Sequence, residues 1–203
     1  VRGATYEMYA DVNSAQYGES QGLKSWNTDG YVLGNNAGYN ANGGTYAGWS
    51  WKMGTTSGLS GGTITPSSYS INAAAGMGIY QYTGTGSAGT ISHGLGKAPA
   101  WIITKRRNAN QAWFVHHKDL SGGNYVRLNN TNQQGSDTNV YPTDMSTTNT
   151  FAVGADDGVN GNGSTYVSYC WAEIPGYSKF GRYMGNGSSS GAFVYCGFRP
   201  AWL

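Results

Sequence analysis

Apolar positions along this chain come in short runs, and clusters of Gly, Asn, Ser or Asp separate the runs. Examples are WIITK at 101–105, WFVHH at 113–117 and YVRLN at 125–129. Runs of β-branched and aromatic residues bounded by turn residues predict strands, and no long stretch has apolar residues at helical spacing. The pattern therefore predicts an all-β protein of antiparallel, sandwich-like modules in tandem, with no significant helix.

The chain contains an internal repeat. The segment GYVLGNNAGYNANGGTYAGWSWK at 30–52 aligns without a gap with TFAVGADDGVNGNGSTYVSYCWA at 150–172, at a constant offset of 120. Matched positions include Tyr46 with Tyr166 and Trp51 with Trp171. We name this segment the A element and predict that it forms a strand, a Gly/Asn loop and a second strand, whose alternate residues share one face.

A second repeat, the B element, aligns YTGTGSAGTISHGLGKAPAW at 82–101 with YMGNGSSSGAFVYCGFRPAW at 183–202, at an offset of 101. The first copy runs on into the strand-like residues 102–105, so the second copy is expected to need a partner for its own strand. That partner would lie further along the same polypeptide or on a neighbouring subunit.

The elements follow one another in the order A, B, A, B, which suggests a division of the chain into modules. We expect residues 1–75 to be the C-terminal part of one module plus a Gly/Ser/Thr-rich connection. Residues 76–175 would be a complete β module, and residues 176–203 the start of a following one. Fibrous appendages and solenoid-like arrays are built from tandem modules of this kind.

Composition narrows the class of protein. The chain has 33 Gly, 16 Tyr and 7 Trp among 203 residues, and only 11% of them are charged. The net charge of +2 comes without a basic stripe, which argues against nucleic-acid binding. No run of 18 apolar residues is present, so we predict no membrane insertion.

Candidate catalytic chemistry is sparse, and we predict no enzyme, no cofactor and no metal site. There is no G-x-S-x-G motif, and the histidines are scattered as His93 and the adjacent pair His116 and His117. The acidic pair at 156–157 aligns with Asn36 and Ala37, so the module does not need its acidity. The loop DDGVNGNGS at 156–164 only loosely resembles a calcium loop, and turn chemistry explains its Gly and Asn residues better.

The aromatic residues can serve a core or a sugar-binding surface. Tryptophans at matched repeat positions are predicted to lie in the core: Trp49, Trp51, Trp101, Trp171 and Trp202. Aromatic residues without an aromatic counterpart in the other copy of the repeat are the better candidates for contacts with a ligand: Trp113, Tyr125, Tyr141, Tyr17 and Tyr39. Cys170 and Cys196 fall on strands that could be neighbours, so the sequence allows a disulfide between them or two free buried thiols.

Five stretches together resemble a known family. They are VRGATY at 1–6, WNTDGYVLGNNAGYNANGGTYAGWSWK at 26–52, YTGTGSAGTISHGLGKAPAWIITKRR at 82–107, YVSYCWAEIPGYSKFG at 166–181 and GNGSSSGAFVYCGFRPAWL at 185–203. They resemble a β-rich repeat domain of bacteriophage tail, tail-fibre and virion appendage proteins, especially from cyanophages and other aquatic phages. Cys196 stands where that family usually has Thr, and His116 where it usually has Tyr, so His116 joins the candidate ligand contacts.

The resemblance implies a non-enzymatic structural and adhesion protein of the virion, located in a tail or an extracellular surface appendage. Its expected partners are other copies of itself, in a trimer or filament, other virion proteins and host surface polysaccharide. Weak glycan contacts would be strengthened by avidity over several copies. The resemblance brings no catalytic residues with it.

Two alternatives stay open. In the first, the protein is a subunit of an extracellular or virion-attached filament that grows head to tail by β-strand complementation. Residues 183–203 would then pair mainly with residues 30–52 of another chain, through contacts that include Tyr183, Phe193, Tyr195, Phe198, Pro200 and Trp202. The second, a polysaccharide-degrading tailspike enzyme, would need two carboxylates facing each other across a cleft.

Overall fold

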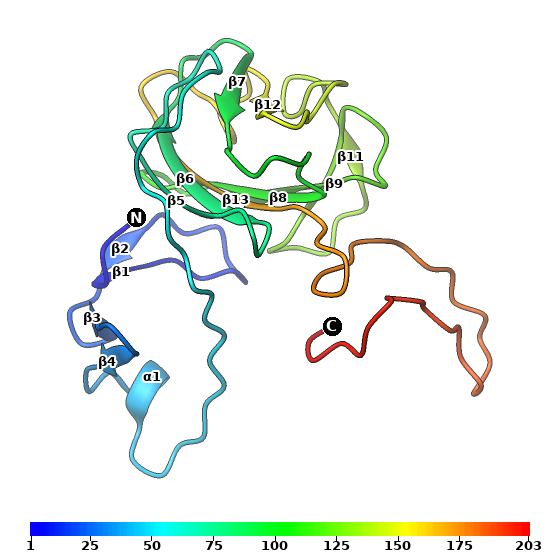
Figure 1. The fold of residues 1–203 in the computed structure, drawn as a ribbon. Helices are drawn as coiled ribbons and strands as arrows, with labels where there is room; N and C mark the ends of the chain where they lie inside the picture. Colours follow the sequence, from blue (N-terminus) through cyan, green and yellow to red (C-terminus); the bar gives the residue numbers. More distant parts are fainter.

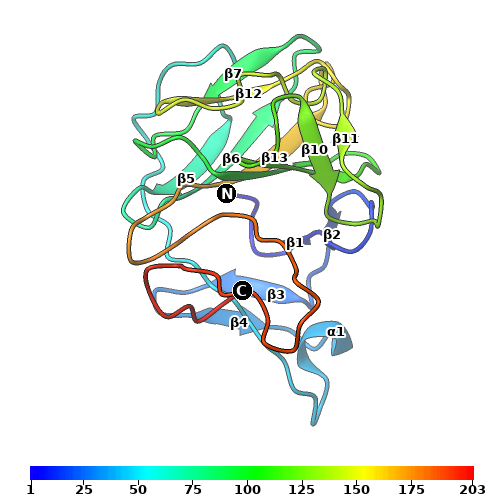
Figure 2. The same ribbon diagram turned by 90° about the vertical axis from the view of Figure 1, so that its right-hand side faces the viewer.

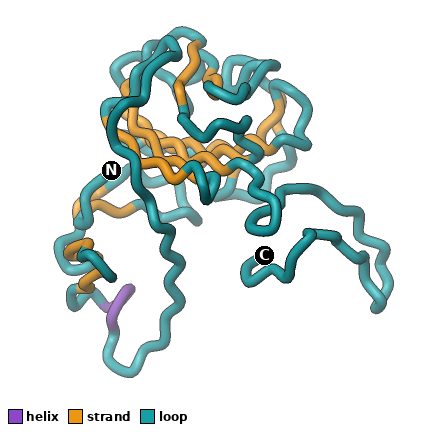
Figure 3. Tube along the Cα trace, in the orientation of Figure 1, coloured by secondary structure: helices purple, strands orange, loops and turns teal.

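The computed structural model describes residues 1–203 and divides into a body and two arms (Figure 1). The body comprises residues 53–174, the N-terminal arm residues 1–52 and the C-terminal arm residues 175–203. Most strands lie in the body, while the arms are largely loop (Figure 3). The one helix, α1 (Ala37–Asn40), has four residues. The predicted all-β class is therefore confirmed.

The body is organised around a seven-stranded antiparallel sheet. Its strands, in spatial order, are β11 (Gly135–Ser136), β10 (Asn124–Arg127), β9 (Trp113–His117), β8 (Trp101–Arg106), β13 (Thr165–Trp171), β6 (Met77–Thr83) and β5 (Ser68–Asn72). Strand β13, from the second A element, lies between β6 and β8, which contain the start and the end of the first B element. The two elements together thus form the middle of one sheet.

A smaller layer covers one face of this sheet (Figure 2). It consists of β7 (Gly89–Ser92) paired with β12 (Thr150–Val153), together with the bridging residues Gly62 and Ile64 beside Ile91. The core fills the space between the two layers, so the body is sandwich-like. Its eighteen buried residues include Tyr80, Tyr82, Tyr141, Phe151 and Tyr166. The hydroxyl groups of the buried tyrosines donate to backbone carbonyls, as from Tyr82 to Val159 at 2.6 Å, which removes the cost of burying them.

The N-terminal arm begins against the other face of the large sheet, which we call the outer face. The indole of Trp113 donates to the carbonyls of Tyr9 and Val12 at 2.9 and 3.2 Å. The backbone N–H of Gln16 donates to the carbonyl of Arg107 at 2.9 Å. The contacting residues lie in the loop of the first of two small hairpins, β1 (Tyr6–Glu7) with β2 (Tyr17–Gly18), and the second hairpin is β3 (Leu23–Trp26) with β4 (Tyr31–Leu33).

The structure corrects the prediction about the tryptophans of the repeat. Trp49, Trp51 and Trp202 are exposed in the arms, and Trp101 and Trp171 are half-buried on the outer face rather than in the core. Burial depends on the strands that cover a residue, and the arm copies lack those strands. The predicted module 76–175 contains β6 to β13, while β5 of the same sheet precedes residue 76.

Candidate functional site

Four of the six residues predicted to contact a ligand are buried in the body. Tyr141 is fully buried and donates its hydroxyl to the carbonyl of Phe114 at 3.1 Å. Tyr125 packs edge-on against Phe114, and Trp113 and His116 are also buried. Burial lowers the pKa of His116 below its usual value, against a hydrogen bond to the Asn124 carbonyl that raises it. These side chains are packing residues, so the expected ligand surface is not formed by them.

The other two predicted ligand contacts, Tyr17 and Tyr39, are half-buried in the N-terminal arm. Tyr17 packs edge-on against Tyr9 with 5.4 Å between the ring centroids. Tyr17 belongs to the first small hairpin and Tyr39 to α1, and Tyr17 is linked to Trp113 only through Tyr9, whose carbonyl accepts from the Trp113 indole. The structure therefore does not bring the six predicted residues together.

The carboxylates of the candidate calcium loop have partners within the protein. Asp156 accepts from the N–H of Gly158 at 2.7 Å, and Asp157 forms an ion pair with Arg106. The amide of Asn160 donates to two carbonyls and accepts the N–H of Thr85 at 2.9 Å. No group of three or more His, Cys, Asp or Glu side chains comes together to hold a metal ion. The loop thus uses these groups to hold its own shape.

The two cysteines are free. Cys170 is fully buried on β13, whereas Cys196 is partly exposed in the C-terminal arm. Of the two options left open by the sequence, the structure has the free thiols, although only one of them is buried. Burial raises the pKa of the Cys170 thiol well above its usual value, so this thiol stays protonated and unreactive.

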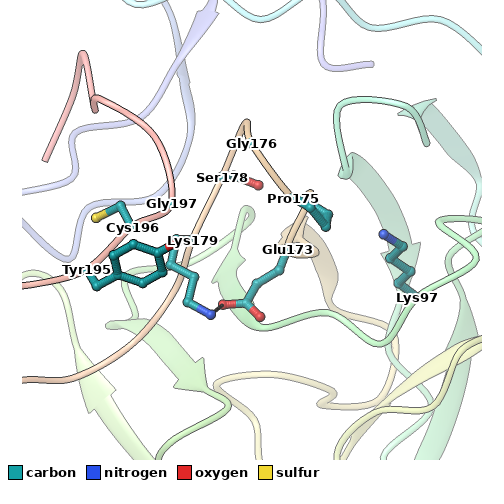
Figure 4. Close-up of a pocket in the computed structure, with 9 residues that line it drawn as sticks. All are labelled: Lys97, Glu173, Pro175, Gly176, Ser178, Lys179, Tyr195, Cys196 and Gly197. Atoms are coloured by element: carbon teal, nitrogen blue, oxygen red, sulfur yellow. Dashed lines mark ion pairs between the residues drawn. The ribbon is translucent and has the colours of Figure 1, made fainter.

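A cavity of about 460 Å³ lies between the body and the C-terminal arm (Figure 4). Its lining residues are Lys97, Glu173, Pro175, Gly176, Ser178, Lys179, Tyr195, Cys196 and Gly197. Figure 4 shows Lys179 pointing at Glu173, and Lys118 lies 3.2 Å from the same carboxylate. Burial raises the pKa of Glu173, but the hydrogen bond from the Phe180 N–H and the two lysines outweigh it and lower the pKa overall. The Phe180 N–H and the two lysines thus hold Glu173 in its charged form.

The two copies of the A element adopt the same turn, one in the body and one in the N-terminal arm. The Tyr166 hydroxyl donates to the Asp157 carbonyl at 2.6 Å and accepts the N–H of Gly161 at 2.8 Å. The Tyr46 hydroxyl donates to the Ala37 carbonyl at 2.8 Å and accepts the N–H of Ala41 at 2.9 Å. Every partner is displaced by 120 residues. The sequence repeat is therefore a structural repeat.

The structural repeat extends further towards the N-terminus than the sequence match. Glu19 accepts the N–H of Gln21 at 2.6 Å, and Asp137 accepts the N–H of Asn139 at 2.8 Å. The offset here is 118, because the connection 23–30 is two residues shorter than its counterpart 141–150. This length difference hid the match from an ungapped comparison. The sign of this match in the sequence is an acidic residue two positions before a residue with a side-chain amide: Glu19 before Gln21, and Asp137 before Asn139.

The same strand is paired in one copy and unpaired in the other. In the body, Tyr166 on β13 has neighbours on both sides and is 0% exposed. In the N-terminal arm, residues 45–51 are the counterpart of β13, yet they form no strand, and Tyr46 is 52% exposed. The N-terminal arm thus contains a preformed turn followed by a strand segment without partners.

The C-terminal arm contains the half-module that complements the one in the N-terminal arm, with segments that match β6 and β7. Residues 178–184 correspond to β6 and residues 190–193 to β7, at the offset of 101. Both segments lack strand pairing, and Tyr183 is 72% exposed whereas its counterpart Tyr82 is 1% exposed. Glycines of the two B elements match in backbone conformation, with φ of +72° and +65° at Gly86 and Gly187. Two unpaired half-modules, one in each arm, are thus the most distinctive feature of the molecule.

The whole chain, residues 1–203, matches the profile of a protein family described as Domain of unknown function (DUF7483), and the chain belongs to this family. No curated protein matches the chain, and no solved structure matches it either. No helix in the structure is long and apolar enough to cross a membrane. The family assignment carries no activity with it, so a function has to be argued from the geometry.

Proposed function

We propose that this protein is a non-enzymatic structural unit of a repetitive β-rich appendage, of the kind that forms phage tail fibres and other virion surface structures. The observation that carries the proposal is the repeated turn. The same hydrogen bonds form around Tyr166 inside a complete sandwich and around Tyr46 in an arm, 120 residues earlier. A protein built of recurring modules, each contacting its neighbours, suits a load-bearing array.

The internal bonding of the body also supports a mechanical role. Strand β13 is hydrogen-bonded along its whole length to β6 and nearly its whole length to β8, so the sheet has a continuous centre. Polar side chains of the loops, such as the amide of Asn160, form hydrogen bonds to backbone carbonyls and so hold the loops in place. Such fully paired modules resist local opening, which an extended appendage requires.

Binding of host surface polysaccharide is a second candidate function, which one group of side chains favours. The rings of Trp101 and Trp171 lie 4.7 Å apart on the outer face, and Tyr169 stacks beside Trp171 at 6.3 Å. All three are half-exposed, and aromatic faces of this kind stack on sugar rings. Trp171→Ala should reduce binding to a polysaccharide array, and the matched variant Trp26→Ala on the exposed β3 hairpin should not.

The structural role is tested by locating the protein on assembled particles. Antibodies raised against the body would be used for immunogold electron microscopy of particles from the natural source. The expected result is labelling at regular intervals along a fibre or other surface appendage. Label that is absent from particles and found only on free, single chains would contradict the proposal, as would polysaccharide cleavage by the purified chain.

A further inference from the structure

The two arms carry halves of a module that the body shows in its complete form. In the body, β13 of the A element pairs with β6 of the B element in an antiparallel register that sets Tyr166 opposite Tyr82. The counterpart of β13 in the N-terminal arm is 45–51, and the counterpart of β6 in the C-terminal arm is 178–184. Neither counterpart forms a strand, and the one bridge within them joins Ser178 to Ile174 of the same chain.

We infer that the C-terminal arm of one copy completes the N-terminal arm of a second copy, with residues 178–184 pairing antiparallel to residues 45–51. This inference rests on the proposed structural role and names the contact by which the units would join. The register follows from the body and sets Tyr183 opposite Tyr46. Residues 190–193 would then lie beside residues 30–33, as β7 lies beside β12.

Aromatic residues recur on both sides of the inferred contact. In the body, Tyr82 stacks on Tyr166 with 5.3 Å between the centroids, and Trp101 lies 4.7 Å from Trp171. Their counterparts are Tyr183 with Tyr46, and Trp202 with Trp51. All four counterparts are exposed in the single chain. Pairing like that in the body would bury the two tyrosine rings and cover part of the two tryptophan rings, and burial of apolar surface is the main driving force for association.

The polar groups of the two halves are complementary as well. In the body, the Asn160 side chain bonds Gly154 of its own turn, and also the Thr85 N–H and the Ser87 carbonyl of the B element. Its counterpart Asn40 has only the first of these bonds, to the Gly34 carbonyl at 2.9 Å. Asn40 lacks the two partners that Asn160 has in the B element. Their counterparts in the C-terminal arm are the N–H of Asn186 and the carbonyl of Ser188.

A glycine fits the same contact. A Cβ at Gly84 would overlap the carbonyl oxygen of Gly161, so the A and B elements touch through backbone at this point. Gly185 is the counterpart of Gly84, and in the single chain a Cβ there would meet nothing within 4 Å. Glycine at position 185 is therefore unexplained within one chain and explained by the approach of a second one.

The positions of the arms favour a second copy over closure within one chain. The N-terminal arm is fixed at one end of β8, where Gln16 bonds Arg107. The C-terminal arm begins at the other end, where Phe180 packs against Trp101. The two arms lie apart beneath the body (Figure 1). Contacts between opposite ends of successive copies generate an open, head-to-tail assembly.

Cysteine cross-linking of the full chain tests the register. Ala47 and Arg182 are counterparts of Val167 and Gln81, which lie directly opposite each other in the body. The variant Ala47→Cys/Arg182→Cys in a Cys196→Ser background would be oxidised with diamide and run on a non-reducing gel. We expect a ladder of covalent multimers. The matched pair Ala47→Cys/Ser189→Cys places the second thiol out of register and should give none. A cross-linked single chain, or no cross-link, would overturn the inference.

Two glycine variants test the contact without cross-linking. Gly185→Ala should fold with an unchanged melting temperature but lose the multimers in analytical ultracentrifugation. Gly181→Ala is its control, because residue 181 corresponds to Tyr80 and a side chain is accommodated there. Assembly of Gly185→Ala like the wild type would refute the contact. Labelled fibres together with a negative result for this contact would overturn only the inference about the arms. Multimers of the purified chain together with unlabelled particles would overturn only the proposed appendage role.

Discussion

The ring of Tyr82 stacks on the ring of Tyr166, with 5.3 Å between the ring centroids and 19° between the ring planes. The pair joins the A and B elements at the centre of the body, and both side chains are buried. Their hydroxyls are bonded to the carbonyls of Val159 and Asp157. The stack is therefore a fully buried contact that joins the two repeat elements.

Loss of this stack should destabilise the body strongly. Tyr166→Ala removes a buried ring and leaves a cavity, which typically costs about 3–5 kcal/mol of the free energy of unfolding. The matched change Tyr46→Ala removes the equivalent ring from the exposed arm and should cost about 1 kcal/mol or less in the single chain. Urea unfolding followed by tryptophan fluorescence gives both values, and similar losses in the two variants would contradict the assignment of the arm as an unpaired half.

The comparison of Tyr166 with Tyr46 also shows which parts of the structure the sequence predicts. The offset of 120 predicts the same turn in both copies, because the glycines and the hydroxyl that form it are local in sequence. Burial of the ring is not local, since it depends on β6 and β8 lying alongside. The repeat alone thus assigned Trp49 and Trp51 to the core, although nothing in the single chain covers them.

Trp113 and Tyr141, predicted as ligand contacts, are buried in the structure for the complementary reason. They lie outside the matched segments, and the sequence offered no reason to place them beneath other residues. In the structure the arm covers Trp113, and Tyr141 bonds to the backbone of β9 from across the core. Contacts between residues about 100 positions apart, as from Trp113 to Tyr9, leave no local pattern to be read. The all-β, sandwich-like class was predictable, and the burial of these particular residues was not.

The buried side-chain amide of Asn160 should contribute strongly to the stability of the body. Asn160→Ala leaves the N–H of Thr85 and the carbonyls of Ser87 and Gly154 without this partner, and each unsatisfied group costs about 1–3 kcal/mol. We expect a marked loss of stability in chemical unfolding. Asn40→Ala is the control, because Asn40 has only one of the three bonds. An equal, small effect in both variants would show that the loop does not depend on this amide.

The two thiols should differ sharply in reactivity. Cys170 is fully buried and its pKa is raised by burial, whereas Cys196 is partly exposed in an arm. In the folded protein at about pH 8, iodoacetamide should modify Cys196 alone, and Cys170 should react only after unfolding. Mass spectrometry of the alkylated peptides locates the label. Modification of Cys170 at the rate of Cys196 would mean that the sheet opens around β13 on the time scale of the reaction.

Stability should rise with pH in a window set by Lys105. This side chain is fully buried under the N-terminal arm, with its Nζ donating to the carbonyls of Arg106 and Asn13 at 2.9 and 3.3 Å. Burial, and then the nearby Arg106, lower its pKa to about 8. In the unfolded chain a lysine has a pKa of about 10.4. Between the folded and the unfolded pKa, the unfolded state therefore binds more protons than the folded state. The contribution of Lys105 to the free energy of unfolding should therefore increase from about pH 8 to about pH 10, by up to about 3 kcal/mol, and the buried Cys170 thiol offsets part of this rise.

Below pH 8 the lysine is protonated in both states, and the full penalty of burying its charge is present in the folded protein. Removal of that charge should abolish the rise, so the free energy of unfolding of Lys105→Met should not increase between about pH 7.5 and 9.5. Above about pH 8.5 it should fall, because the Cys170 thiol then loses its proton in the unfolded chain while burial keeps it protonated in the folded protein. Lys97→Met, at an exposed loop position, is the control and should keep the rise. Measurements stop at about pH 9.5, because the unfolded state begins to lose tyrosine protons near about pH 10 while burial holds the pKa of Tyr82 and Tyr166 higher. A rise of equal size in Lys105→Met would assign the effect to another group.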